Sequence, residues 1–321
     1  MGVNRSCILA ALAAGLACAG PAVAEDCLNP DALGTARTLA VDPALFSRVG
    51  TMQYAATFPL HAREVVLTFD DGPMPPMTTK VLETLRNECV KATFFLVGRN
   101  VKSSPGVARQ IAGEGHTIGN HTENHHLVTL AGPHGVQELD KGFRSIADAL
   151  EPAGVRAAPF FRFPGLFNTH AVEMHAKAKV SVMSADMVAD DWTGLRPEHI
   201  IARAIARLQQ KGSGILLLHD VQPALALALP KLLRELKTRG YRIVHIIPAP
   251  GAGAPATPEP IIAKKQPPAP ARKVATRVTP KKSEAETVAE FSVLARLRKM
   301  MEQRKGAAIA ISYPGNVSGG H

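Results

Sequence analysis

Short apolar segments alternate with segments of helical apolar spacing over residues 64–247. The apolar segments begin at Val65 (VVLTF), Ala92 (ATFFLV), His116 (HTIGNH), Phe160 (FFRF), Val180 (VSVMSAD), Gly214 (GILLLHD) and Tyr241 (YRIVHII). Between them, apolar residues recur three or four positions apart, as over 81–85, 107–111, 200–208 and 229–236. Strands that alternate with helices favour a parallel sheet. The pattern therefore predicts an α/β fold, a distorted barrel of about seven parallel strands, with a doubly wound open sheet as the alternative.

The first 24 residues have the layout of a secretory signal peptide. Arg5 supplies the positive charge, residues 7–19 are apolar, and Ala22 and Ala24 are small residues suited to cleavage after Ala24. The apolar segment is shorter than the roughly 20 residues that a membrane-spanning helix needs. A lipid anchor on Cys18 is the alternative, but the residues before it fit a lipoprotein signal poorly. We therefore expect a secreted protein, periplasmic or associated with the cell envelope.

The rest of the chain divides by composition. Residues 25–63 are expected to form an N-terminal lead-in with one or two short elements, and residues 64–248 the principal domain. Residues 249–282 are rich in Pro, Ala and Lys, so they cannot bury a core and are expected to form a disordered linker. Residues 283–321 form a basic tail with amphipathic helical spacing, which either binds a surface or packs on the domain.

The net charge of +10 does not by itself indicate a nucleic-acid-binding protein. Much of the positive excess lies in the tail beyond Pro248, so the net charge is a property of the tail more than of the folded domain. For an exported protein, the expected polyanions are envelope polymers or anionic lipid.

Two cysteines, Cys27 and Cys89, remain once the signal peptide is removed. In an oxidising compartment they either pair or stay as two free thiols, and the sequence leaves both alternatives open. Neither lies beside a recognisable base, so we assign neither to catalysis.

Polar clusters follow the predicted strands at the points where those strands end. The first strand runs into Asp70, Asp71 and Gly72, and the third runs into His121 and His125. The carboxyl ends of parallel strands meet at one rim, where α/β proteins build their active sites. Two imidazoles four residues apart and one carboxylate suit zinc or a similar cation, and they leave coordination positions open for water and substrate.

The sequence contains one more candidate ligand and three further polar clusters. His126 is a weaker candidate ligand because its spacing from His121 is less natural, and the remaining histidines outside these motifs are expected to be structural or on the surface. Three more polar clusters follow later strands, at residues 162–165, 190–192 and 217–220. Chance would scatter such clusters, so their common position at strand ends indicates a catalytic rim.

The ordered motifs TFDDGP, HTENH, RFPG, DDW and LLLHD resemble those of the polysaccharide deacetylase family, also called the nodulation-protein-B homology domain or carbohydrate esterase family 4. The resemblance covers roughly residues 60–248 and implies that residues 64–248 are a catalytic domain. It implies that Asp71, His121 and His125 hold a divalent metal. Zinc is the expected ion from the ligand type, with nickel, cobalt and manganese as alternatives.

The resemblance also implies the acid and base of the reaction. Asp70 would be the catalytic base, with Arg162 paired to it to keep it charged. His219 would be the general acid, and Asp191 would hold it in its protonated, correctly turned form.

The resemblance assigns the acetyl pocket and the oxyanion contact to a further set of residues. Trp192 and Leu217 would line the pocket, and the backbone N–H of Gly165 would assist at the oxyanion. The sequence departs from the common pattern at Gly165, where the family usually has an aromatic residue, and at Val188, where many members have another Asp. Because neither departure touches a ligand or the acid–base pair, activity is expected and substrate preference is left open.

The expected activity is metal-dependent removal of N- or O-acetyl groups from an acetylated polysaccharide or oligosaccharide such as chitin, peptidoglycan or an exopolysaccharide. A catalytically silent carbohydrate- or envelope-binding protein on the same fold is the alternative from another class. All the expected ligands and the base are present, which favours the enzyme. A metal amidohydrolase acting on small amides or peptides would share the same metal site.

Overall fold

In a computed structural model, the described residues are 27, 29–126, 133–176 and 179–252. The predicted signal peptide, most of the linker and the whole basic tail lie outside them. Within them, ten strands form one sheet: β1 (Thr35–Val41), β2 (Arg48–Val49), β3 (Glu64–Asp70), β4 (Thr93–Leu96), β5 (Thr117–Asn120), β6 (Phe160–Phe161), β7 (Ser181–Met183), β8 (Met187–Val188), β9 (Gly214–His219) and β10 (Arg242–Pro248).

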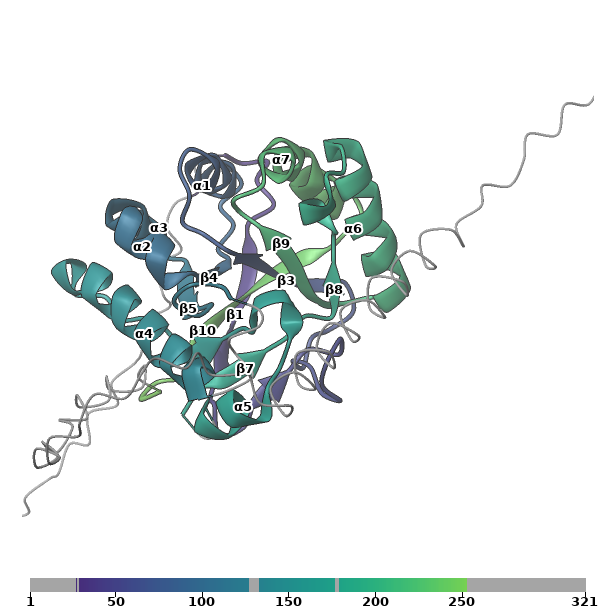
Figure 1. Cartoon of the computed structure of the whole chain (residues 1–321). Coiled ribbons are helices and arrows are strands. Elements are labelled where there is room, and N and C mark those ends of the chain that lie inside the picture. The colour runs from purple at the N-terminus through teal and green to yellow at the C-terminus, as the bar shows by residue number, and fades with distance from the viewer. Residues whose placement is uncertain (1–26, 28, 127–132, 177–178, 253–321) are drawn as a thin grey trace, which may run out of the picture.

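Seven α-helices occur in the described residues and lie around the strands (Figure 1). They are α1 (Met77–Asn87), α2 (Gly98–Ser103), α3 (Pro105–Gly113), α4 (Pro133–Leu150), α5 (His170–Ala176), α6 (Pro197–Lys211) and α7 (Pro223–Thr238). Helices α1, α3, α6 and α7 cover the four segments in which the sequence shows helical spacing. None of the described helices has both the length and the apolar character that crossing a bilayer requires.

Every strand pairing is parallel, as the alternation of strands and helices predicts. The strands β7, β6, β5, β4, β3, β9 and β8 follow one another across the sheet. The two ends of this path, β7 and β8, are neighbours in the chain and are joined by residues 184–186 without pairing to each other. The predicted distorted barrel of about seven parallel strands is confirmed, with its irregularity between β7 and β8.

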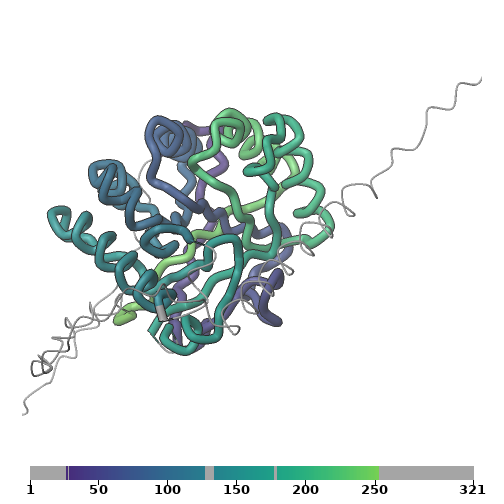
Figure 2. The backbone as a smooth tube through the Cα atoms, in the orientation of Figure 1, coloured from purple at the N-terminus to yellow at the C-terminus, as the bar shows by residue number. Residues whose placement is uncertain are grey.

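The lead-in belongs to the same sheet. Strand β1 pairs with β10 from Thr35 to Val41, and β2 pairs with β7. Figure 2 shows the N-terminal segment in purple beside the yellow-green C-terminal strand. Cys27 and Cys89, whose pairing the sequence left open, form a disulfide with a Cα–Cα distance of 5.9 Å.

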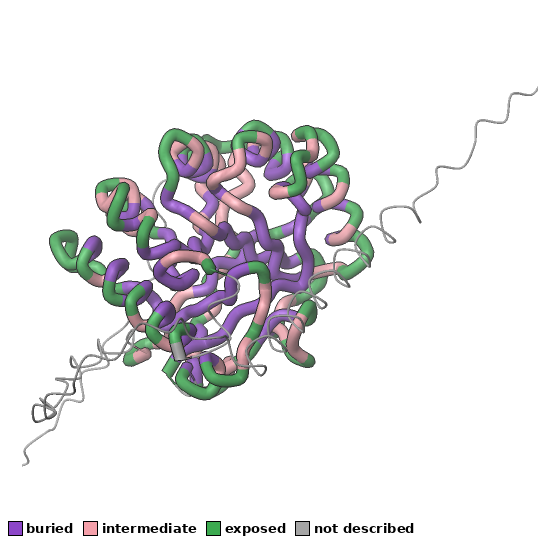
Figure 3. The backbone as a smooth tube through the Cα atoms, viewed as in Figure 1, coloured by how far each residue is buried: buried purple, intermediate pink, exposed green. Residues whose placement is uncertain are grey.

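Strand β3 is buried along its whole length and divides two layers of core. Val65, Leu67 and Phe69 pack with the helices, whereas Val66 packs with Phe95 and other residues in a second cluster. Figure 3 shows this arrangement as buried central strands and exposed outer helix faces. Since side chains alternate along a strand, Thr68 and Asp70 share the face of Val66. The sequence therefore directs Asp70 to the interior face where β3 ends.

Candidate active site

Asp71 lies just past the end of β3, in a turn that only a restricted set of residues tolerates. Asp71 has φ 79°, and a cis peptide bond follows between Gly72 and Pro73. A Cβ on Gly72 would lie 2.2 Å from Oδ2 of the wholly buried Asp220. The side-chain amide of Asn100 donates to Asp71 O at 2.7 Å. The turn is thus held from two sides, and glycine is required where the chain passes Asp220.

The two histidines of the HTENH motif reach Asp71 from the loop after β5. His125 Nε2 lies 3.1 Å from Asp71 Oδ1, and His121 Nε2 lies 3.4 Å from the same oxygen. One donor atom from each of the three residues falls within 4.8 Å of the others, and the described residues contain no other such group of three. His126 is not part of it. The sequence-predicted ligand set is therefore brought together at the rim.

The orientation of His121 indicates what the three side chains are arranged to hold. Its Nδ1 lies 2.8 Å from Arg162 O, and because a carbonyl only accepts, Nδ1 carries the proton of the neutral ring. Its Nε2 then directs a lone pair towards Asp71 Oδ1, which is buried and has no hydrogen-bond partner among the described residues. Two acceptors that face each other in a buried site need a cation between them. The donor set fits a divalent metal such as zinc.

The charge of Asp71 follows from the same neighbours. Burial raises the pKa of its carboxyl. In the metal-free site, however, a proton on Nε2 of either imidazole and the charge of His219 outweigh burial and hold the pKa well below its ordinary value. Asp71 is therefore a carboxylate, which is the form that coordinates metals.

Asp70 pairs with a wholly buried arginine inside the barrel. Arg162 Nη1 donates to Asp70 Oδ1 at 2.7 Å and to Thr68 Oγ1 at 2.8 Å. Its Nε and Nη2 donate to the carbonyls of Met183 and Ser184. Burial lowers the pKa of Arg162, and the charge of Asp70 opposes that effect. The arginine thus makes two hydrogen bonds to backbone carbonyls and two to side chains, and it points its charge at Asp70.

His219, at the end of β9, is held by Asp191. Its Nδ1 lies 2.9 Å from Asp191 Oδ1, and its backbone N–H donates to Asp191 Oδ2 at 2.8 Å. Burial lowers the pKa of His219, but the hydrogen bond and charge of Asp191 more than offset burial and raise the pKa to about 9. The ring is therefore protonated at neutral pH, with Nε2 carrying a proton away from Asp191.

Apolar residues border the ring of His219. The rings of Trp192 and His219 meet edge to face at 5.1 Å, and the buried Leu217 shares a face of β9 with His219. Trp192 and Leu166 both pack against the cluster that contains Leu217. Gly165 has φ 58°.

The turn around Gly165 uses its other backbone donors internally. The N–H groups of Leu166 and Phe167 donate to Phe163 O and Pro164 O. No acceptor contacts the Gly165 N–H among the described residues, which leaves it available to a substrate oxygen.

The sequence motifs assigned no role to several residues that contact Arg162. Besides Asp70, its partners are Thr68, two backbone carbonyls, and the ring of Phe95, whose centroid lies 4.2 Å from the guanidinium carbon. Thr68 was within reach of the sequence, because it precedes Asp70 by two positions in a strand. Asp190, by contrast, belongs to a predicted polar cluster but turns away from the rim to pair with two arginines of α6.

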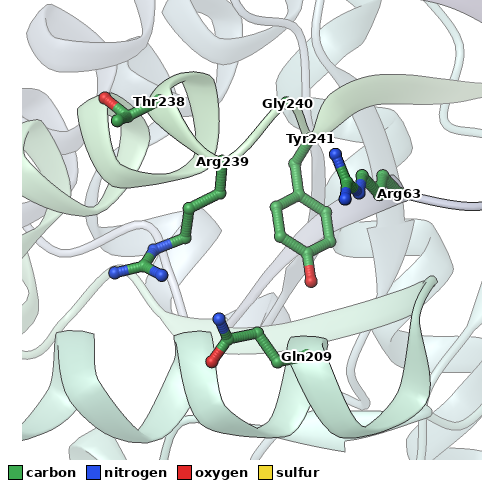
Figure 4. Close-up of a pocket in the computed structure, with 6 residues that line it drawn as sticks. All are labelled: Arg63, Gln209, Thr238, Arg239, Gly240 and Tyr241. Carbon is green, nitrogen blue, oxygen red and sulfur yellow. The ribbon is translucent and has the colours of Figure 1, made fainter.

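A cavity of about 480 Å³ lies at the other end of the fold (Figure 4). It is lined by Arg63, Gln209, Thr238, Arg239, Gly240 and Tyr241. Arg63 precedes β3 and Tyr241 precedes β10, so this cavity opens where the strands begin and shares no residue with the rim.

Comparison with known proteins gives consistent matches. Residues 59–182 match the family model described as polysaccharide deacetylase. Over 194 residues the chain is 34% identical to a peptidoglycan-N-acetylglucosamine deacetylase of Bacillus cereus, which covers 59% of this chain and 88% of that protein. Over 172 residues it is 34% identical to a chitooligosaccharide deacetylase of Azorhizobium caulinodans, covering 53% of this chain and 79% of that protein.

A solved structure is also similar over most of the described residues. A peptidoglycan deacetylase of Bdellovibrio bacteriovorus aligns with a TM-score of 0.61 at 30% identity, covering 69% of this chain and 61% of that one. The chain thus spans somewhat less than two thirds of that solved protein.

Proposed function

Because this chain belongs to the polysaccharide deacetylase family, we propose that it hydrolyses acetyl groups on an acetylated glycan with a divalent cation held by Asp71, His121 and His125. The observation that carries the proposal is the convergence of three possible metal-ligand atoms, from one carboxylate and two imidazoles, on one point at the rim. Asp70, paired with the buried guanidinium of Arg162, can act as the base, and the protonated His219 can act as the acid. Together with the metal site, these two residues meet the requirements of amide hydrolysis.

A bound divalent cation would polarise the acetyl carbonyl and lower the pKa of a water molecule from 15.7 to about 7. Zinc suits two imidazoles and one carboxylate best, and nickel, cobalt and manganese are alternatives.

Asp70 is the residue that takes the proton of the attacking water. It lies beside the metal ligands, with Oδ2 at 3.8 Å from His121 Nε2, while its other oxygen is occupied by Arg162. The guanidinium restrains the rotation of the carboxylate. One oxygen of Asp70 is thus anchored, and the other is free to accept a proton at the metal site.

His219 donates a proton to the leaving group. An amine cannot leave as an anion at neutral pH, so breaking the C–N bond requires an acid. Asp191 keeps His219 charged and fixes its ring, so that the Nε2 proton is the one delivered. The Gly165 N–H is suited to donate to the oxyanion, and Trp192 and Leu217 to enclose the acetyl methyl group.

The substrate class follows from the relatives rather than from the site. The similar proteins are named for peptidoglycan and for chitooligosaccharide, and both glycans carry N-acetylglucosamine. We infer an N-acetylated glycan of the cell envelope as the first substrate to test, with an O-acetyl ester as the alternative. This assignment agrees with an exported enzyme, in which residues 1–24 are a signal peptide, 249–282 a linker, and 283–321 a basic tail that contacts anionic envelope polymers or lipid.

The test measures acetate release by the purified protein after chelation and after reloading with zinc. Chito-oligosaccharide, peptidoglycan and acetylated xylan serve as substrates, and Asp70→Asn serves as the matched inactive control. We expect zinc-dependent release from an N-acetylated glycan, with none after chelation. Zinc-loaded protein that released no acetate from any of the three would contradict the proposed activity.

A further inference from the structure

Helix α4 presents one face to the loop that carries His121 and His125. Glu138, Gly142 and Ser145 follow one another at intervals of four and three residues, so they lie along one side of the helix. Each of the three meets residues of the 120–125 loop. The metal-binding loop therefore rests on a helix surface whose residues no motif of the site includes.

Glu138 makes the most specific of these contacts. Its Oε2 accepts from the backbone N–H of Asn124 at 2.8 Å, and its Oε1 accepts from Asn124 Nδ2 at 2.9 Å. Its backbone carbonyl accepts from Glu123 N at 3.0 Å. Glu138 is buried, so these bonds are shielded from competition by water. The Glu138 side chain thus hydrogen-bonds to both the backbone and the side chain of Asn124, the residue before His125.

Gly142 brings the helix close enough for this contact. A Cβ at position 142 would lie 2.3 Å from Asn120 Oδ1 and 2.8 Å from the backbone of Thr122. Asn120 Oδ1 also accepts from Thr122 N at 2.9 Å, so a larger residue would disturb the start of the loop. On the same face, Ser145 Oγ donates to Glu123 Oε2 at 2.7 Å.

The loop needs external support because its backbone is strained. Thr122 has φ 71° and His125 has φ 58°, values at which side chains with a Cβ are disfavoured. The His121 side chain is 2% exposed and is fixed by its surroundings, whereas the His125 side chain is 29% exposed. His125 therefore depends on its backbone for its position more than His121 does.

We propose that Glu138, acting through Asn124, is a positioning residue that sets His125 for metal binding. The proposal rests on the metal site of the proposed function and goes beyond it, because it assigns a role to a residue that touches neither metal nor substrate. Partners that orient metal ligands commonly change metal affinity by about 10- to 100-fold when removed.

The same helix offers a matched control. Asp140 lies two residues from Glu138, and its Oδ1 pairs with His175 Nε2 of α5 at 2.9 Å, away from the loop. Glu138→Gln and Asp140→Asn each remove one negative charge from α4 with almost no change in shape. In Glu138→Gln, the new NH₂ group faces Asn124 Nδ2, so two donors replace a donor and an acceptor.

The experiment measures zinc affinity by competition with a chromogenic chelator, the melting temperature of the metal-free protein, and acetate release as zinc is raised. For Glu138→Gln we expect zinc affinity to fall about 10- to 100-fold. We also expect the metal-free protein to stay folded, with a melting temperature lowered by about 2–8 °C for the lost buried hydrogen bond, and turnover to recover at saturating zinc. Asp140→Asn should match the parent protein in all three measurements. Recovery at high zinc distinguishes positioning from catalysis.

Wild-type zinc affinity in Glu138→Gln, or an equal loss in Asp140→Asn, would overturn the proposal. If Glu138→Gln does not fold, Asn124→Ala supplies the second test, because it removes one of the two bonds and should give a smaller loss of the same kind. The affinity measurement uses no substrate, so it stands even if the proposed glycan is wrong. A parent protein that binds no zinc would overturn the metal site and this proposal together.

Discussion

The histidines at the two ends of β5 lie in different surroundings. His116 directly precedes β5 and His121 directly follows it. At the rim, His121 and His125 face Asp71, and His219 faces Asp191. At the start of β5, His116 accepts a hydrogen bond from the backbone N–H of Ala92, and its ring contacts the Phe94 ring in a tilted arrangement.

A second interior histidine is His245 on β10. Its Nε2 lies 2.9 Å from Thr117 Oγ1. Because Thr117 donates its own proton to Ile246 O, His245 Nε2 must be the donor in this contact. Neither interior ring has a carboxylate in a hydrogen bond with it.

The pKa values of His116 and His245 move in the opposite direction to that of His219. Burial, with the nearby charge of Lys91, lowers the pKa of His116 to about 3 and that of His245 to about 4. At the rim, Asp191 more than offsets burial and raises the pKa of His219 to about 9. His116, His219 and His245 are all largely buried, so the opposite shifts follow from the carboxylate that hydrogen-bonds to His219 alone among them, and not from burial.

The largest expected difference between the rim and interior histidines concerns metal binding and turnover. His125→Ala should abolish zinc binding and activity, whereas His245→Gln should leave both intact, because Gln also donates to Thr117. Asp70→Asn should retain zinc but lose turnover by about 10²- to 10⁴-fold, since only the base is removed. Zinc affinity from chelator competition and acetate release check this. Equal zinc loss in Asp70→Asn and His125→Ala would mean that the roles of the two residues are exchanged.

An intermediate effect is expected when the rim histidine loses its carboxylate. A group with a raised pKa acts as an acid until the pH passes that pKa, so activity on an amide should fall above about pH 9. In Asp191→Asn this alkaline limb should move down by about 1 to 3 pH units, and amide hydrolysis at neutral pH should drop by about 10-fold or more.

An activated aryl acetate is the control substrate for Asp191→Asn and for His219→Ala. Its leaving group needs no proton, so its hydrolysis should suffer much less than that of an N-acetyl glycan. The pH dependence of kcat/KM on both substrates measures this. An equal loss on both substrates would argue against the acid role of His219.

The smallest effect is expected on stability in mild acid. His116 and His245 have folded pKa values below the usual 6.5, so the unfolded chain binds protons first as pH falls. Their contribution is complete above about pH 6.5 and is lost as pH falls from there towards 4. At pH 5 each histidine should cost about 2 kcal/mol of the free energy of unfolding.

Urea unfolding at pH 7, 6 and 5 measures this loss. His116→Asn and His245→Gln preserve one ring hydrogen bond each and cannot titrate, so the pH slope should become shallower in both variants. A slope that stayed the same in the double variant would show that these rings do not set the acid sensitivity of the fold.

The sequence predicted the strands well because each is a short apolar segment bounded by turn residues. β3, β4, β5, β9 and β10 coincide with predicted segments, and the segment beginning at Val180 contains β7 but ends just before β8. The helices α2, α4 and α5 were not named, although α4 spans 18 residues and carries Glu138. Val136, Leu139, Phe143 and Ile146 recur at helical spacing, so the apolar pattern could have predicted this helix, but it could not have predicted that Glu138 contacts the loop.

The sequence by itself determined the order and the chemistry of the motifs, because a strand that ends in acidic or imidazole side chains places them at the rim of any parallel sheet. It also determined that Asp70 and Thr68 share a face, through the alternation of a strand. Only the tertiary structure decided three contacts. Asp190 forms ion pairs with α6, Cys27 forms a disulfide with Cys89, and Glu138 hydrogen-bonds to Asn124. These contacts join residues from separate elements, and their partners are set by how helices pack on the sheet, which no local pattern encodes.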